Sequence, residues 1–186
     1  MKDIDIIRSD FPLLQKKVYG KPLVYFDNGA TTQKPLCVME EVRKVYTEYN
    51  GNVHRGVHAM SDQTSEAYEG AREKVRSFIN AGKAEEVVFT SGTTGSINAI
   101  AFSFGERYIR QGDEIIVSEL EHHANIVPWQ MLCQRKGAVL RVIPFNEAGE
   151  LKTDEYLKLL SPRTRIVAVT QVSNALGTVV PLEEII

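Results

Sequence analysis

Short apolar runs alternate with amphipathic stretches along the chain, and this alternation predicts strands followed by helices. The runs at 114–117, 138–143 and 165–170 have the length and the branched apolar residues of buried strands. Strand-helix-strand units at this spacing are typical of a mostly parallel sheet that is covered by helices on both faces. The pattern therefore predicts the α/β fold class.

The same pattern predicts further elements on either side of these strands. Ser61 is suited to cap a long helix whose apolar face runs from Ala67 to Ile79, and Asn80-Ala81-Gly82 is suited to end it. The remaining expected elements are strands at 23–26 and 86–90 and helices at 35–49, from Thr93, at 125–136, at 153–160 and from Pro181.

Two features bear on domain organisation. A weak boundary before Lys21 separates an amino-terminal arm at 1–20 from a partial large domain at 21–186. The helix that Pro181 opens has acidic residues near its start, but the sequence stops after six residues. A helix of that length is only marginally stable, so we expect the chain to be a truncated piece of its domain.

Composition argues against several classes of protein. The formal net charge of -2 gives no electrostatic basis for binding nucleic acid, and no apolar run approaches the roughly 20 residues of a membrane span. The acidic, amphipathic start of the chain is not a secretory signal. Cys37 and Cys133 form no Cys-x-x-Cys pair, so we expect a reduced, cytoplasmic protein in which Cys133 is a buried structural thiol.

The first candidate for chemistry is the loop Glu121-His122-His123-Ala124-Asn125. It follows the run at 114–117 and precedes a predicted helix, so two imidazoles lie at the carboxyl end of a strand. Ligands bind at that edge in α/β proteins, and an imidazole there can stack on a flat ring, carry a proton or hold a metal. A helix-entry loop that happens to contain histidine is the alternative, and this loop alone leaves both open.

The second candidate is the glycine turn that precedes Thr93 and Thr94. Backbone N–H groups and the helix dipole at a helix start suit an anion, and Gly92 lets the backbone approach it closely. The sequence is neither a P-loop nor Gly-x-Gly-x-x-Gly. It predicts a phosphate cradle, with an ordinary threonine cap as the alternative.

The third candidate is Asn174, which follows the predicted strand at 165–170. Its amide offers a donor and an acceptor to a ligand, although asparagine is also common in turns. Together, three successive loops would present a phosphate cradle, an imidazole pair and an amide at one edge of the sheet. Such an edge would suit a flat, phosphorylated heterocycle.

Five segments, in order along nearly the whole chain, resemble the amino-terminal part of the NifS-like cysteine desulfurases. This family lies within the class V aminotransferase group of pyridoxal-phosphate enzymes, and the Suf-type branch is the most similar. The matching segments are 25–35, 53–58, 89–94, 121–129 and 172–177.

The resemblance implies a fold-type I large domain that binds pyridoxal 5'-phosphate. The whole protein would convert L-cysteine to L-alanine and pass persulfide sulfur to an acceptor of the Suf system for iron–sulfur cluster assembly. It would act as a homodimer.

The resemblance also implies roles for the matching residues. Thr93 and Thr94 would bind the cofactor phosphate, and His122 would stack on the pyridine ring and act in catalysis as a proton shuttle. Asn174 would bond the ring oxygen or the substrate carboxylate, whereas His123 would lie behind the site.

A second group would line the site for substrate or for the partner subunit. It consists of Ala30, His54 and Arg55. Apart from the resemblance, His54 and His58 could suggest a metal, but Gly56 breaks the helix that this spacing needs, so we expect no metal site.

The family's Schiff-base lysine, the aspartate under the pyridine nitrogen, the persulfide cysteine and the carboxylate-binding arginine would all lie beyond the equivalent of Ile186. The fragment should therefore be inactive alone. Gly95 stands where Suf-type relatives often carry an acid, which puts helix-end and subunit-interface contacts there in doubt. The alternatives are a selenocysteine lyase or kynureninase-like enzyme and, from another class, a non-catalytic phosphate-binding or dimerisation module.

Overall fold

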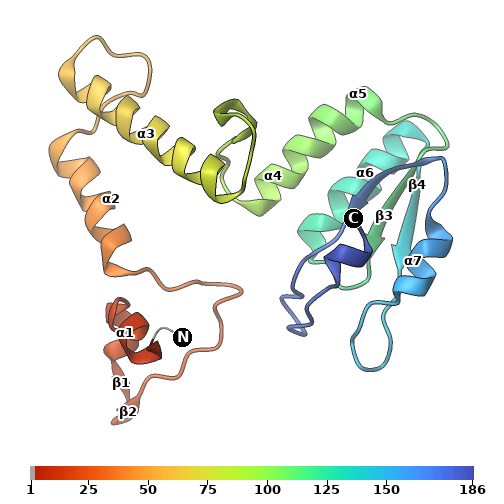
Figure 1. Cartoon of the computed structure of the whole chain (residues 1–186), viewed down its shortest axis with the longest axis horizontal. Helices are drawn as coiled ribbons and strands as arrows, with labels where there is room; N and C mark the ends of the chain where they lie inside the picture. The colour runs from red at the N-terminus through yellow and green to blue at the C-terminus, as the bar shows by residue number, and fades with distance from the viewer. Residues whose placement is uncertain (1–2) are drawn as a thin grey trace. The chain divides into compact units, whose positions relative to one another are not determined.

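The computed structural model describes residues 3–186, which form two compact units (Figure 1). Unit one ends at Val88, and unit two runs from Phe89 to Ile186. In unit one, β1 (Lys17–Val18) pairs antiparallel with β2 (Lys21–Pro22). The division into an arm at 1–20 and a domain at 21–186 stays a prediction.

Unit one is built mostly from two helices. The helix predicted at 35–49 is present as α2, which begins directly after Pro35. The long helix that follows is α3, and it ends before Asn80, whose φ of 56° turns the chain away. The helical elements of unit one are α1 (Ile4–Ser9), η1 (Pro12–Gln15), α2 (Leu36–Glu48), α3 (Ala59–Phe78) and η2 (Ala84–Glu86).

The cap of α3 differs from the prediction. His58 is the N-cap, and its Nδ1 accepts a hydrogen bond from the Ser61 N–H at 3.3 Å. The Ser61 hydroxyl donates instead to the Asn52 carbonyl at 2.6 Å. The helix therefore begins two residues before Ser61, because an imidazole takes the role expected of a hydroxyl.

Two predicted strands are not formed within the described residues. The segments at 23–26 and 86–90 pair with no neighbouring strand. Side chains take backbone carbonyls that a neighbouring strand would otherwise bind: Arg8 donates to the Leu23 carbonyl at 2.7 Å, and Arg72 to the Val87 carbonyl at 2.6 Å. Apolar composition alone does not make a strand without a ladder partner.

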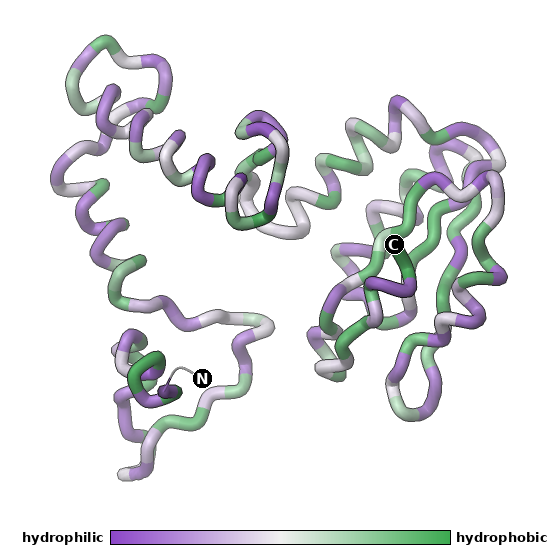
Figure 2. Tube along the Cα trace, in the orientation of Figure 1, coloured by the Kyte–Doolittle hydropathy of each residue, from purple (hydrophilic) through white to green (hydrophobic). Residues whose placement is uncertain are grey.

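The three strands predicted in unit two form one parallel sheet, as expected. β3 (Glu114–Ser118) lies between β4 (Val139–Ile143) and β5 (Thr164–Ala168). These strands include some of the most hydrophobic parts of the trace (Figure 2). All five residues of β3 are buried, as a strand covered on both faces should be.

Helices and turns surround this sheet. The predicted helices from Thr93, at 125–136 and at 153–160 are present, whereas the helix predicted from Pro181 is a single 3₁₀ turn. The elements of unit two other than strands are α4 (Thr93–Ile100), the π-helical η3 (Ala101–Gly105), α5 (Glu106–Tyr108), η4 (His123–Asn125), α6 (Val127–Lys136), α7 (Thr153–Leu159) and η5 (Leu182–Glu184).

The two faces of the sheet have separate cores. Ile115 of β3 packs in a cluster with Trp129 and Leu132 of α6. The next residue, Ile116, packs in a second cluster with Tyr156 of α7. Because successive side chains of a strand point to opposite faces, α6 and α7 cover opposite faces of the sheet. The α/β fold with a doubly covered parallel sheet is thus confirmed.

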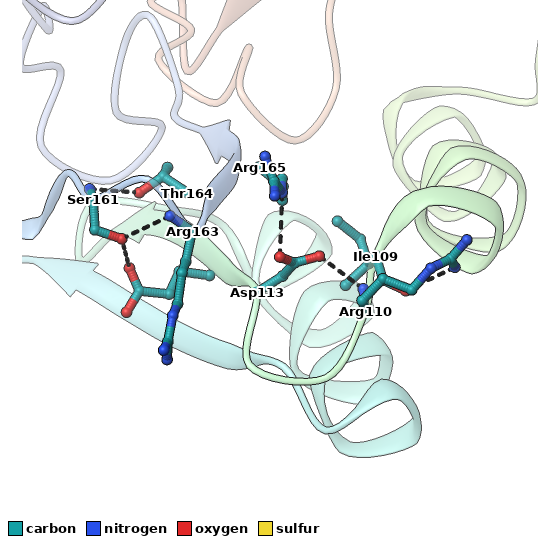
Figure 3. A network of polar contacts seen from close by, with 8 residues as sticks. Ile109, Arg110, Asp113, Ser161, Arg163, Thr164 and Arg165 are labelled. Carbon is teal, nitrogen blue, oxygen red and sulfur yellow. Dashed lines mark hydrogen bonds and ion pairs between the residues drawn. The ribbon is translucent and has the colours of Figure 1, made fainter.

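A polar network fixes the amino ends of the strands (Figure 3). Asp113 accepts hydrogen bonds from the Arg110 N–H at 2.8 Å and from the Arg165 Nε at 3.2 Å. Glu114 accepts from the Ser161 hydroxyl at 2.6 Å and from Arg141, and these two bonds lower the pKa of its carboxyl. The carboxyl ends of β3 and β5 lead into the loops that carry the candidate site residues.

Candidate functional site

The start of α4 has the features of an anion site. Gly92 is the N-cap with φ 124° and ψ 179°, a conformation that essentially only glycine adopts. Among residues 3–186 no side chain caps the first turn of α4, so the N–H groups of this turn remain free to donate hydrogen bonds. Thr93 and Thr94 are exposed, and their hydroxyls make no hydrogen bond within residues 3–186.

The turn before α4 is held by its own hydroxyl groups. The Thr90 hydroxyl lies 2.7 Å from the Ser96 hydroxyl and donates to the Gly92 carbonyl at 3.0 Å. A Cβ at Gly95 would lie 2.9 Å from the Ser91 Oγ, so a side chain there would have to displace that hydroxyl. The two neighbouring threonines are left for a ligand.

His122 follows β3 and opens the turn η4. Its Nδ1 accepts a hydrogen bond from the Ala124 N–H at 3.1 Å, so in the neutral ring the proton lies on Nε2. The side chain is exposed. The ring of His123 meets that of His122 edge-on at 6.2 Å between centroids, and it too is exposed.

Asn174 lies in a tight turn after β5. Buried Ser173 holds this turn, because its hydroxyl accepts from the Leu176 N–H at 3.2 Å and its carbonyl accepts from the Gly177 N–H at 2.9 Å. The Asn174 side chain is exposed, and its amide makes no hydrogen bond in the described chain. Its donor and acceptor are therefore available.

Unit two brings these predicted groups onto one framework. α4 packs against η4, so the helix that Thr93 begins and the loop of His122 are neighbours. Asn174 and His122 both follow strands of the same parallel sheet, at its carboxyl edge. One expectation is corrected: α4 follows an unpaired segment instead of a strand, so only two of the three loops leave strand ends.

The residues predicted to face the substrate or a partner subunit belong to unit one. The His54 Nε2 lies 2.9 Å from the Oε1 of Glu69 in α3, and the backbone of His54 has a φ of 60°. Arg55 is exposed and forms no ion pair among residues 3–186. Ala30 is exposed in the turn that the Thr31 N–H closes onto the Asp27 carbonyl at 2.9 Å. Their shared role stays a prediction.

The remaining chemical groups of the described chain indicate no second site. In residues 3–186 no group of three or more His, Cys, Asp or Glu side chains could hold a metal ion. Burial raises the pKa of the Cys133 thiol, and Cys133 packs in the α6 cluster as predicted. Cys37 is exposed on α2. Within the same residues, no helix is both long and apolar enough to cross a membrane.

Glu121 was not identified as a site residue from the sequence. It is buried beside His122 and accepts hydrogen bonds from three other residues. The available signal was an acid directly before the histidine pair, because a carboxylate that becomes buried there needs donors.

Residues 24–186 match the family model described as aminotransferase class-V. The chain belongs to this family. The resemblance noted from the sequence is thereby confirmed at the level of the family.

Three similar proteins are longer than this chain. It is 54% identical to a cysteine desulfurase of Synechococcus elongatus over 99% of its length, and 52% identical to one of Dickeya dadantii over 98%. The chain spans 29% and 44% of those proteins. The apo structure of a cysteine desulfurase from Thermococcus onnurineus matches with a TM-score of 0.88 and 38% identity, over 99% of this chain and 44% of that one.

Proposed function

We propose that the whole protein is a cysteine desulfurase, which converts L-cysteine to L-alanine and passes persulfide sulfur to an acceptor. The observation that carries the proposal is the uncapped start of α4, with two free threonine hydroxyls, packed against the loop of His122. The similarity to cysteine desulfurases over nearly the whole chain supports the substrate. Because the chain spans under half of those proteins, the activity is proposed for the whole protein.

The residues present fit pyridoxal 5'-phosphate. First-turn N–H groups and the helix dipole favour a phosphate at α4, and the hydroxyls of Thr93 and Thr94 add two donors. The cofactor would supply an electron sink for bond cleavage at the substrate. The cradle holds only the phosphate end, so the ring must be oriented by other groups.

His122 and Asn174 are the groups of unit two suited to orient the ring. The exposed His122 imidazole has a flat face for stacking and an Nε2 that can carry a proton. The unpaired amide of Asn174 can donate to the ring oxygen or to a substrate carboxylate. In this proposal His122 moves a proton through Nε2, because Nδ1 is already occupied by the Ala124 N–H.

The finer assignments belong to the same proposal. They are a Suf-type branch with a Suf-system sulfur acceptor, a homodimer in which Ala30, His54 and Arg55 line the partner's site, and a cytoplasmic location. Arg55 supports the shared site of a homodimer, since it is exposed without an ion pair among the described residues. The free thiols of Cys37 and Cys133 support the cytoplasmic location, because reduced thiols are typical of the cytoplasm.

The test uses the full-length protein, supplied with pyridoxal phosphate and L-cysteine, selenocysteine or kynurenine. We expect alanine and persulfide from L-cysteine in preference to the other two substrates. Preference for selenocysteine or kynurenine would favour a lyase or a kynureninase-like enzyme. Cofactor binding without turnover of any of the three would favour a non-catalytic module and contradict the proposal.

Removing the two hydroxyls tests the cradle directly. Thr93→Val and Thr94→Val should each weaken binding of pyridoxal phosphate by roughly tenfold, since each removes one hydrogen bond to a charged group. Thr153→Val is the matched control, because Thr153 also begins a helix of unit two but lies at α7. Equal losses in all three variants would mean that the α4 hydroxyls do not bind the phosphate.

A further inference from the structure

A partly buried chain of hydrogen bonds links the end of β3 to α6 and to the end of β5. The Glu121 Oε1 accepts from the Ser118 hydroxyl at 2.5 Å and from the Thr170 N–H at 2.8 Å. Its Oε2 accepts from the Asn125 Nδ2 at 2.8 Å, and the Asn125 Oδ1 accepts from the Trp129 Nε1 at 2.9 Å. Ser118, Glu121 and Trp129 are all buried.

The direction of every bond in this chain is fixed by its two ends. Glu121 as a carboxylate only accepts, and the Trp129 indole only donates. Asn125 stands between them, so its amide must donate toward Glu121 and accept from Trp129. A substitution that reverses the direction of one of these bonds therefore places two donors, or two acceptors, against each other.

This chain of bonds encloses the histidine loop. Glu121 and Asn125 flank the three residues from His122 to Ala124, and their side chains are bonded to each other. Within the loop, the Asn125 N–H donates to the His122 carbonyl at 2.8 Å, and the Ala124 N–H donates to His122 Nδ1. The bond from Glu121 to Asn125 therefore closes the loop that sets the His122 ring.

The same carboxylate also reaches the second candidate loop. Thr170 lies just after β5, and Asn174 follows it in the turn that Ser173 holds. The bond from the Thr170 N–H to Glu121 thus joins the segment that leads to Asn174 to the loop that carries His122. One buried side chain connects the two groups that would orient the ring.

We propose that Glu121 is the positioning residue of this site. Its carboxylate holds the loop of His122 closed, fixes the ring with Nδ1 as acceptor and Nε2 as the free nitrogen, and ties the Asn174 segment to the same point. The effect of Glu121 on turnover rests on the proposed function. The effect on the His122 ring does not, and it can be measured without substrate or cofactor.

The direction of the bonds suggests a pair of substitutions. Glu121→Gln puts an amide N–H donor against the amide donor of Asn125. Turning the glutamine amide moves this donor–donor mismatch to the Thr170 N–H, and turning the asparagine amide moves it to the Trp129 indole. Asn125→Asp puts two carboxylates together. The double variant E121Q/N125D restores every bond, because the new glutamine accepts from Thr170 and donates to the new aspartate, which accepts from Trp129. Its net charge equals that of the original protein.

The first readout is nitrogen NMR of the protein with ring-labelled histidine and tryptophan, without cofactor. In the original protein we expect His122 in the Nε2–H form and a slowly exchanging Trp129 indole proton. Each single variant should lose the His122 signature, because the bond that closes the loop is broken in both, and E121Q/N125D should recover it. The Trp129 signature should be lost where the mismatch falls on the indole and should be present in E121Q/N125D. Trp129→Phe assigns the indole signal, and His123→Ala distinguishes the two imidazoles.

The second readout is turnover of L-cysteine by the full-length protein. Each single variant should lower kcat by roughly 10- to 100-fold, since small displacements of catalytic groups have effects of that size. The double variant should regain most of this loss. If Glu121→Gln does not fold, recovery of the fold and of the His122 signature in the double variant still supports the proposal.

Three results would overturn the positioning role. They are single variants with an unchanged His122 signature, a double variant that recovers neither signature, and a double variant that does not fold. Rescue of the signatures in a protein without desulfurase activity would contradict the proposed function alone and would support the role of Glu121 in setting the His122 ring. The two hypotheses therefore fail on different observations.

Discussion

Two adjacent histidines differ in whether a backbone N–H holds the imidazole ring. The Nδ1 of His122 is held by the Ala124 N–H, so the ring has a defined orientation. The His123 ring makes no hydrogen bond among the described residues and contacts His122 edge-on. A side chain that must stack on a cofactor ring and transfer a proton needs a fixed orientation, which His122 has.

We therefore expect unequal effects from removing them. In the full-length protein, His122→Ala should lower kcat for alanine formation by about 100-fold or more, the usual contribution of a general acid or base. His123→Ala should cost less than about tenfold and is the matched control. Cofactor content, measured on both variants, separates loss of binding from loss of chemistry. A larger loss at His123 would reverse the assignment.

The two cysteines should differ in reactivity. Burial raises the pKa of Cys133, which lowers its thiolate fraction at neutral pH, whereas Cys37 is exposed on α2. In the folded chain we expect iodoacetamide to modify Cys133 more slowly than Cys37, because burial both raises the pKa of the Cys133 thiol and shields it from the reagent. Peptide mass spectrometry measures both rates, and equal rates in urea provide the control. Equal rates in the native protein would refute the expectation.

Among single residues, the sequence predicted the exposed candidate residues of the loops better than the buried residue that holds those loops in place. His122, Thr93 and Asn174 belong to loops whose composition indicates binding, and the structure finds all three exposed in unit two. Glu121 was missed because its role depends on Thr170, which is 49 residues away in the sequence. Local pattern carries no information about such a contact.

Among the elements, α4 depends most on one backbone conformation. Gly92 has φ 124° and ψ 179°, but a Cβ there would meet nothing within 4 Å. Space is therefore available, and only the backbone conformation requires glycine.

Gly92→Ala should lower the free energy of unfolding by about 1–3 kcal/mol, the cost of forcing another residue into this region, and should weaken binding of pyridoxal phosphate. Gly70→Ala is the matched control, because Gly70 is helical in α3 and a Cβ there also meets nothing. It should stabilise the protein by roughly 0.5–1 kcal/mol. Thermal unfolding and cofactor titration measure both. A neutral Gly92→Ala would show that α4 begins differently.

The parallel sheet should be sensitive to acid through Glu114. Hydrogen bonds from Ser161 and Arg141 lower its pKa below 4.5, so it stabilises the fold above that pH. This stabilisation is lost as the pH falls through the lowered value. Glu114→Gln should therefore destabilise the protein near pH 7, and the difference from the original protein should shrink in acid.

Urea unfolding at a series of pH values measures this difference. Glu155→Gln is the control, since Glu155 only pairs with exposed Lys158 on α7. Its effect should be small and nearly independent of pH. A Glu114→Gln difference that stays constant or grows as the pH falls would contradict the assigned direction.

The strands that the sequence predicted correctly are those whose partners lie within the described residues. β3, β4 and β5 pair with one another, and their apolar runs are sufficient to locate them. The segments at 23–26 and 86–90 have similar apolar runs but find no ladder partner in the part of the chain that the structure describes, so they do not form strands there. Strand prediction from composition fails where pairing decides the outcome.

In the molecule as a whole, apolar burial is unevenly divided between the two units. Both core clusters lie in unit two. In the described part of unit one, only Tyr49 and Val87 are buried apolar residues. The helices α2 and α3 instead expose large apolar side chains, which include Tyr46 at 72% and Phe78 at 90%. We therefore expect the free energy of local opening to be higher in unit two than in unit one.

Hydrogen exchange of the 186-residue chain tests this expectation. Amides of β3 should exchange slowest, because all five residues are buried and both neighbouring strands accept its hydrogen bonds. Amides of α2 should exchange at least about 100-fold faster, since a difference of roughly 3 kcal/mol in local opening corresponds to that factor.

The matched comparison is α6, a helix that lies against the sheet and buries Trp129 and Leu132. If helices simply exchange faster than strands, α6 and α2 should behave alike. If buried apolar surface decides, α6 should resemble β3. Protection of α2 equal to that of α6 would mean that unit one is stabilised by something other than the apolar contacts seen in its described residues.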